Sequence, residues 1–196
     1  MVCNISKKFY FHYFLNFHYL MRTSHDIFAA PMMVTQGQLF KTFLKWGHLF
    51  QVEFDITVHA LPTDKDWANI FHFTQNSDNS AYGDRIPALW IYKSGYFLIC
   101  STVNGNKNFC LWSKFDLDEK YHFLIQQYVM NGKIMYKIEK NGQSLLSIEN
   151  KMAQDFNNVK VYTSNPWHKP FTSDYGLLEN LKISNPIGKY QKPIVN

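Results

Sequence analysis

Two carboxylates, Glu53 and Asp55, alternate along one stretch of the chain and are the residues best placed for acid and base chemistry. Retaining glycoside hydrolysis needs a nucleophile and a separate acid/base about 5–5.5 Å apart. Thr57 occupies the next alternate position and adds no carboxylate, and the sequence has no Gly-x-Ser-x-Gly elbow. We therefore expect no enzyme. Glu53 and Asp55 are interpreted as polar residues on the exposed face of an edge or outer strand.

Loop oxygens offer a second kind of chemistry, because calcium takes six to eight oxygen ligands. The candidates are Asp64, Asp66, Asp78, Asp84, Asn104, Asn106 and Asn165. No spacing gathers them into one motif. Zinc is not predicted, since the histidines have neither cysteine partners nor His-x-x-x-His spacing.

The segment 82–87 is the most suggestive loop. Gly83 permits a sharp bend and Pro87 fixes the entry into a strand, so Asp84 and Arg85 are expected at or near a loop tip. The interpretation we favour is a local ion pair that pins the loop. The alternative is a calcium ligand, Asp84, beside a polar contact to a bound molecule, Arg85.

Trp67 and Trp167 each lie beside a turn-forming segment. Rings in such places serve as anchors in the core or at its rim, with the indole N–H bonded to a carbonyl. A platform on which a sugar stacks is the alternative. We favour anchors, because buried aromatic residues are the commoner case.

Cys100 and Cys110 flank an Asn-Gly turn at a spacing that permits a disulfide. If residues 104–106 form a three-residue hairpin loop closed by Val103 and Lys107, counting outward places the two cysteines opposite each other. They then form a non-hydrogen-bonded pair, whose Cα atoms lie about 4.5 Å apart. We expect a disulfide if the protein is secreted and free thiols in a reducing compartment.

The elements that position these residues are strands. Apolar and polar residues alternate from 49 to 59, and Asn-Gly dipeptides supply the positive φ angles of tight hairpins. The pattern predicts ten strands, at 49–60, 67–74, 87–92, 96–103, 107–112, 121–130, 133–140, 143–149, 159–164 and 177–184. The segment 36–45 is a short helix or an opening strand. We predict an all-β antiparallel sandwich, because a sheet with one apolar face needs a second sheet to cover it.

The 196 residues suit one domain, and the net charge is +5. The lysines are scattered and only Arg22 and Arg85 are arginines, so nucleic acid binding is not expected. A solvated basic surface or binding of sulfated glycans explains the charge equally well.

The start of the chain differs from the rest. Lys7-Lys8, the apolar stretch 9–21 and Ala29-Ala30 resemble a secretory signal peptide, but the stretch is short for a membrane span, which takes about 20 apolar residues. An irregular or helical aromatic extension, or a misplaced gene start, is the alternative. We divide the chain into a leader or extension at 1–35, which includes Cys3, a sandwich domain at 36–185 and a tail at 186–196.

Seven segments carry a resemblance to a known superfamily. They are FQVEFDI at 50–56, WANIFHFT at 67–74, YGDRIPAL at 82–89, LICSTVNGN at 98–106, MYKIEKNG at 135–142, NVKVY at 158–162 with NPW at 165–167, and GLLENLKI at 176–183. Over roughly residues 47–184 the chain resembles the laminin-G-like, concanavalin-A-like jelly-roll superfamily, in a form found in extracellular proteins of simple animals.

The resemblance implies a secreted or cell-surface module that binds glycans or extracellular proteins, with calcium as a candidate cofactor held by Asp84 and carbonyl oxygens of another loop. It points to a binding rim formed by Asp84, Arg85, Asn104, Asn106, Asn165, Trp167 and His168. Glycosidases of that fold carry Glu-x-Asp-x-Glu, and Thr57 replaces the last acid. The alternatives are a structural or matrix protein and, less favoured, a degenerate glycosidase. The sequence leaves the oligomeric state open and predicts no stable membrane span.

Overall fold

A computed structural model of the chain describes the backbone at residues 24–28, 34–186 and 190–191, and the side chains at 34–186. These parts contain fourteen strands. Within them, no helix is long and apolar enough to cross a membrane. The predicted leader features at Lys7-Lys8, 9–21 and Ala29-Ala30, together with Cys3, lie outside the described residues.

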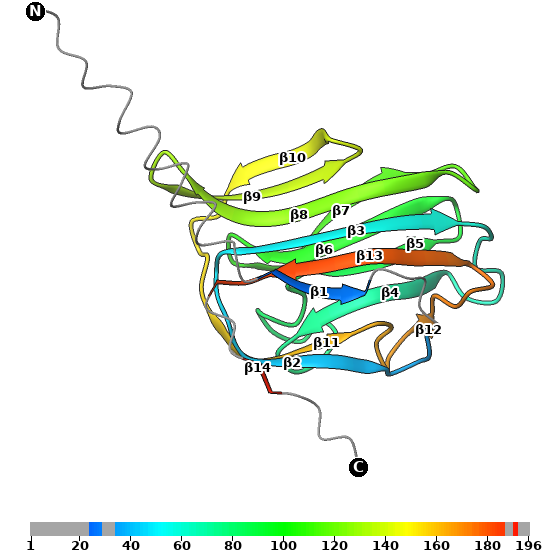
Figure 1. Ribbon diagram of the computed structural model, residues 1–196, viewed down its shortest axis with the longest axis horizontal. Helices are drawn as coiled ribbons and strands as arrows, with labels where there is room; N and C mark the ends of the chain where they lie inside the picture. Colours follow the sequence, from blue (N-terminus) through cyan, green and yellow to red (C-terminus); the bar gives the residue numbers. More distant parts are fainter. Residues whose placement is uncertain (1–23, 29–33, 187–189, 192–196) are drawn as a thin grey trace, which may run out of the picture.

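The strands form two sheets that lie face to face (Figure 1). The six-stranded sheet has the order β1 (Ser24–Phe28), β13 (Gly176–Ser184), β3 (Phe50–Val58), β8 (Lys120–Met130), β9 (Lys133–Lys140) and β10 (Gln143–Glu149). The eight-stranded sheet has the order β14 (Tyr190–Gln191), β2 (Leu39–Trp46), β11 (Phe156–Tyr162), β4 (Trp67–Thr74), β5 (Ala88–Tyr92), β6 (Tyr96–Val103) and β7 (Asn106–Lys114). Its eighth strand, β12 (Lys169–Pro170), pairs in parallel with β4, and all other pairs are antiparallel.

The predicted fold class is therefore confirmed. All ten predicted strands are present, with their ends moved by at most three residues. The ambiguous segment 36–45 is a strand, β2, because it pairs with β11 and buries Phe43 and Trp46 in the core. Two further strands, β1 and β14, pair with β13 and β2 from outside the range 36–185.

The core lies between the sheets and is rich in aromatic rings. Phe54 of β3 contacts Phe71 of β4 and Phe123 of β8, with ring centroids 5.1 and 5.4 Å apart, so it joins the two layers. Trp46 contacts Phe73 at 5.4 Å near one edge of the core. Burying such a side chain contributes about 2–3 kcal/mol. The alternation seen in the sequence thus places one set of rings inside the sandwich.

The hairpin of β6 and β7 places Cys100 opposite Cys110, as predicted, and the two form a disulfide with Cα atoms 4.1 Å apart. The loop is shorter than predicted, because Val103 pairs with Asn106 and only Asn104 and Gly105 form the turn. A bulge beyond the turn then inserts one residue into β7 and restores the register of the cysteines. A disulfide of this kind fits an extracellular protein.

Gly176 is the first residue of β13 and lies opposite Val58 of β3. Its φ is +153°, and a Cβ at this position would lie 2.0 Å from the carbonyl oxygen of Thr57. Gly132, in the β8–β9 turn, has a φ of +73° and open space around it.

We expect Gly176→Ala to destabilise the protein by about 3 kcal/mol or more, because backbone strain and overpacking add. Gly132→Ala is the matched control and should cost about 1–2 kcal/mol from backbone strain alone. Urea unfolding followed by tryptophan fluorescence measures both. Equal losses would show that the contact with Thr57 is unimportant.

Candidate functional site

The solvent-facing side of the eight-stranded sheet carries an apolar cluster that is separate from the core. Ala88, Trp90 and Cys100 are buried there, and Trp67, Leu98 and Cys110 pack against them. Alternate residues of a strand point to opposite faces, so β4 to β7 place one row of large side chains in the core and a second row outside it. This second row is the unusual feature of the molecule.

Four aromatic side chains meet at one end of this outer row: Trp67, Tyr92, Tyr96 and Trp112, which we call the aromatic platform. Trp67 lies 4.3 Å from Tyr92 and 5.4 Å from Trp112, measured between ring centroids. Trp112 lies 5.5 Å from Tyr92 and 6.1 Å from Tyr96. Its side chain is 49% exposed. Four strands therefore present a group of touching rings to the solvent.

Strand register creates the aromatic platform. Trp67 pairs with Tyr92, which pairs in turn with Tyr96. Trp112 pairs with Leu98, which follows Tyr96 by two residues on β6. Trp112 was not among the predicted site residues, although it follows Cys110 by two residues and so shares its face. Trp67, expected to anchor the core or its rim, lies on the outer face and packs on the platform rings.

The part of the outer face around Trp90 is covered by the loop before β5, which includes Asp84 and Arg85. Asp84 is only 1% exposed, so the expectation of a displayed loop tip is wrong. Its carboxylate accepts hydrogen bonds from the N–H groups of Ser77, Ser80 and Ala81 and from the Ser77 hydroxyl, at 2.7–3.2 Å. Burial opposes ionisation, but these bonds prevail and lower the pKa of Asp84. Asp84 pins the loop through backbone amides rather than through an ion pair with Arg85.

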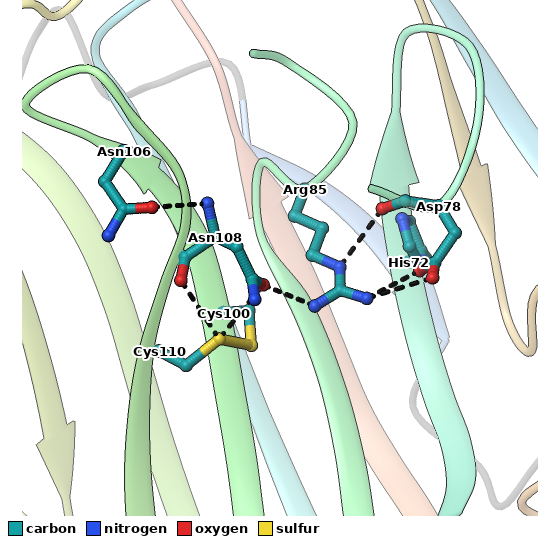
Figure 2. The surroundings of a disulfide bond; sticks show 7 residues. All are labelled: His72, Asp78, Arg85, Cys100, Asn106, Asn108 and Cys110. Atoms are coloured by element: carbon teal, nitrogen blue, oxygen red, sulfur yellow. Dashed lines mark hydrogen bonds and ion pairs between the residues drawn. A yellow bond between two sulfur atoms is a disulfide. The ribbon is translucent and has the colours of Figure 1, made fainter. Parts of the chain in front are cut away.

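Arg85 also points inward and is 8% exposed. Its guanidinium donates two hydrogen bonds to the carboxylate of Asp78, at 2.9 and 3.0 Å, and another to Asn108 on β7 (Figure 2). The guanidinium carbon lies 4.5 Å from the ring centre of Trp90, which is a cation–π contact. The ion pair predicted for Arg85 exists, but with Asp78 as the partner.

His72 connects this loop to the one that follows β11. Its Nε2 lies 2.6 Å from the carbonyl oxygen of Asp84 and must carry a hydrogen, so its Nδ1 accepts a hydrogen bond from Asn165 Nδ2 at 2.8 Å. Burial lowers the pKa of His72 to about 4. A neutral imidazole is therefore the form that fits between the two loops.

Asn165, Trp167 and His168 form the second covering loop. The side-chain oxygen of Asn165 accepts hydrogen bonds from the backbone N–H groups of both other residues, at 3.1 and 2.9 Å. His168 Nε2 lies 3.8 Å from Asp78, and burial lowers the pKa of its ring. Trp167 remains 43% exposed, with its ring edge against His72. Five predicted rim residues thus belong to one hydrogen-bonded region.

The other two predicted rim residues serve the β6–β7 turn. Asn104 donates to the carbonyl of Glu149 at 2.8 Å and accepts from the N–H of Lys151 at 2.7 Å. Asn106 accepts from the N–H of Asn108 at 2.9 Å. Their side chains hold local backbone in place, and only Asn106 is adjacent to the region around Arg85 (Figure 2).

The disulfide lies beside this region (Figure 2). Cys110 Sγ is 3.1 Å from Asn108 Oδ1, a close sulfur–oxygen contact, because a disulfide sulfur carries no hydrogen to donate. Asn108 thus lies between the disulfide and the guanidinium of Arg85. The cross-link attaches β7, the last strand of its sheet, to β6 at the place where the covering loop is anchored.

Glu53 and Asp55 lie on the opposite side of the molecule, on the outer face of the six-stranded sheet. The prediction placed them on an edge or outer strand; their strand, β3, lies between β13 and β8 and is not at an edge. Asp55 accepts from Asn180 Nδ2 at 2.6 Å and pairs with His122 Nδ1 at 2.8 Å. Burial favours the neutral form of Asp55, but these contacts prevail and lower its pKa. This face is a ladder of paired charges.

No group of three or more His, Cys, Asp or Glu side chains in the described ranges is placed to bind a metal ion. The donors around Asp84 are N–H and O–H groups, which a calcium ion would have to displace. A cavity of about 10 Å³ between the sheets, lined by Trp46, Gln127 and Asn150 among others, has room for one water molecule.

Comparison with known proteins gives no family. A scan of protein-family models and a search of curated proteins both find no match. Among solved structures, the chain is similar to a mutant of HCR/D, with a TM-score of 0.50 and 13% identity, over 80% of this chain and 42% of that one.

Two other solved structures are similar. The native heptameric SAP-like pentraxin from Limulus polyphemus has a TM-score of 0.46 and 13% identity, over 82% of this chain and 72% of that one. The Ruminococcus gnavus IT-sialidase CBM40 bound to alpha2,3 sialyllactose has a TM-score of 0.47 and 9% identity, over 81% and 92%. At these identities the likeness concerns the fold alone, a jelly-roll β-sandwich.

We expect Asp84→Asn to destabilise the protein by about 2 kcal/mol, because an amide accepts fewer of the four hydrogen bonds and loses their charge. Asp118→Asn is the control, since the Asp118 side chain is 74% exposed. Urea unfolding at pH 7 measures both. If the two variants are equally stable, Asp84 does not pin the loop.

The stability of the protein should fall as the pH is lowered from about 7 to 4. The unfolded chain binds a proton at His72 near pH 6.5, whereas the buried ring resists protonation until about pH 4. Stability is thus present above the unfolded pKa and is lost as the pH falls. His72→Gln should flatten this decline, and His59→Gln, at an exposed histidine, should leave it steep. A decline of equal steepness in both variants would contradict the assignment.

Proposed function

We propose that this protein is a non-catalytic extracellular recognition module that binds glycans on the aromatic platform. The observation that carries the proposal is the group of touching rings at Trp67, Tyr92, Tyr96 and Trp112, of which Trp112 is about half exposed and the other three are partly exposed. Aromatic faces stack on the apolar faces of sugar rings, and sites for small ligands combine such surfaces with a few polar groups. The platform replaces the polar loop rim as the expected centre of binding.

The difference between the two outer faces supports this choice. The six-stranded sheet covers its solvent side with paired charges such as Asp55 with His122 and Lys120 with Glu179. The eight-stranded sheet leaves Trp112 half exposed, although it buries Trp90 a short distance away. An exposed cluster of large apolar side chains marks an interaction site more often than a lone one does.

Polar groups border the aromatic platform and can orient a sugar. Asp66 and Lys93 form an ion pair of 2.8 Å beside the Trp67–Tyr92 pair, and both are about half exposed. His168 lies 5.7 Å from Trp90, the residue that precedes Tyr92 on the same face of β5. Hydroxyl groups of a glycan need such partners, because stacking alone gives little orientation.

Several finer expectations belong to this proposal. The laminin-G-like resemblance and the disulfide support a secreted or cell-surface location. The aromatic platform favours glycans over proteins as the partner. Non-catalytic action is supported by Asp55, which is tied to Asn180 and His122, and by Thr57 in place of a further acid. Calcium at Asp84 stays a prediction. A structural or matrix role is the second candidate and is favoured by β10, which pairs on one side only among the described residues.

The test is a glycan array probed with the full chain, with calcium and again with a chelator, followed by calorimetry on the strongest ligand. We expect Trp112→Ala to weaken binding at least tenfold, because it removes the most exposed ring of the platform. A chelator effect would support calcium as a cofactor.

Trp167→Ala is the matched control, since Trp167 is similarly exposed but lies on the covering loop. It should leave affinity within about twofold of wild type. Loss in Trp167→Ala alone would return the site to the loop rim around Asn165. An array with no signal would count against glycan binding and favour the structural role.

A further inference from the structure

Lys114 extends the outer row of the aromatic platform by one residue. It pairs across strands with Tyr96 and follows Trp112 by two positions on β7, so it shares their face of the sheet. Because the cysteine pair at 100 and 110 has Cα atoms 4.1 Å apart, Tyr96 and Lys114 have the same non-hydrogen-bonded geometry. Side chains in such pairs lie about 4.5–5.5 Å apart at Cβ. An ammonium group therefore lies within reach of the platform rings.

Lys114 is exposed, and none of the described carboxylates forms an ion pair with it. The neighbouring charges are already matched. Lys93 is paired with Asp66 at 2.8 Å, and Arg85 with Asp78 at 2.9 Å. The ammonium of Lys140 donates to the backbone carbonyl of Lys114 at 2.8 Å and lies over the ring of Tyr121. Of Arg85, Lys93 and Lys114, only Lys114 has no carboxylate partner among the described residues.

We propose that the aromatic platform selects acidic glycans, with Lys114 binding a carboxylate or sulfate group of the sugar that stacks on Trp112 and Tyr96. This inference rests on the proposed function. Stacking supplies contact to any sugar with an apolar face, so it cannot separate a neutral sugar from an acidic one. A single unmatched cation beside the rings makes that distinction, because it gains a charge-assisted hydrogen bond only from an anionic ligand.

The inference has a defined chemical scope. Carboxylate and sulfate share negative charge and acceptor oxygens, and Lys114 offers three donors to either. A lysine, unlike an arginine, does not impose a bidentate geometry, so it can bind the acidic group of sialic acid, uronic acid or a sulfated sugar. This contact is exposed to solvent, so added salt should screen it and weaken binding of the acidic glycan.

The experiment uses the full chain on an array that holds sialylated, uronic-acid and sulfated glycans beside their uncharged counterparts. We expect the acidic members to bind more strongly than their neutral counterparts. Lys114→Gln should weaken the acidic members roughly fivefold or more and leave neutral ones unchanged, which removes the preference. Calorimetry on the best acidic ligand and its neutral counterpart then measures the difference at low and high salt.

Lys160→Gln is the control, because it changes net charge equally on the same sheet. Lys160 lies on β11, across from Thr42 and Thr74 and away from the aromatic platform. It should keep the preference for acidic glycans. Binding of neutral glycans alone that depends on Trp112, or acidic binding that survives Lys114→Gln, would overturn the inference while the proposed function stands. No glycan binding at all would overturn both.

Discussion

The surface of the eight-stranded sheet depends on one buried polar group, the imidazole ring of His72. A neutral ring has one donor and one acceptor, and here each is used once, toward the Asp84 carbonyl and the Asn165 amide. The two loops that cover the face are thus attached to the same side chain. A buried polar group without a partner costs about 1–3 kcal/mol, so the two loops and the ring are held in place together. The aromatic platform lies on the same sheet, and its Trp112 ring stays about half exposed.

The two covering loops are held in place by charged side chains that form hydrogen bonds within them. Asp84 gathers backbone amides of its own loop, and Arg85 extends over Trp90 to join Asp78 and Asn108. Asn108 lies beside the disulfide, so the edge strand β7 and the covering loop support each other. Trp112 and Lys114 are on that same strand. Two of the groups proposed to contact a ligand therefore lie on a strand that is held both by a covalent bond and by an ion-pair network.

Side-chain direction explains which site expectations were right and which were wrong. Asp84, Arg85 and Asn165 belong to the binding rim that the resemblance implied, but their side chains form hydrogen bonds within the protein. Polar residues in loops suggest a binding site, but such side chains as often form hydrogen bonds to the nearby backbone and hold the loop in place. Trp112 was missed because a single aromatic residue in an alternating strand looks the same whether its face is covered or open.

The sequence by itself determined the local features: strands of period two, Asn-Gly hairpins and the opposition of Cys100 and Cys110, because each depends on residues close together in the chain. The hairpin count gave the correct cysteine pair even though the loop was one residue shorter, since a bulge compensated. Only the tertiary structure decided the order of strands and which outer face is covered. Those depend on contacts such as Asn69 with Asn165, 96 residues apart, whose pairing no local pattern encodes.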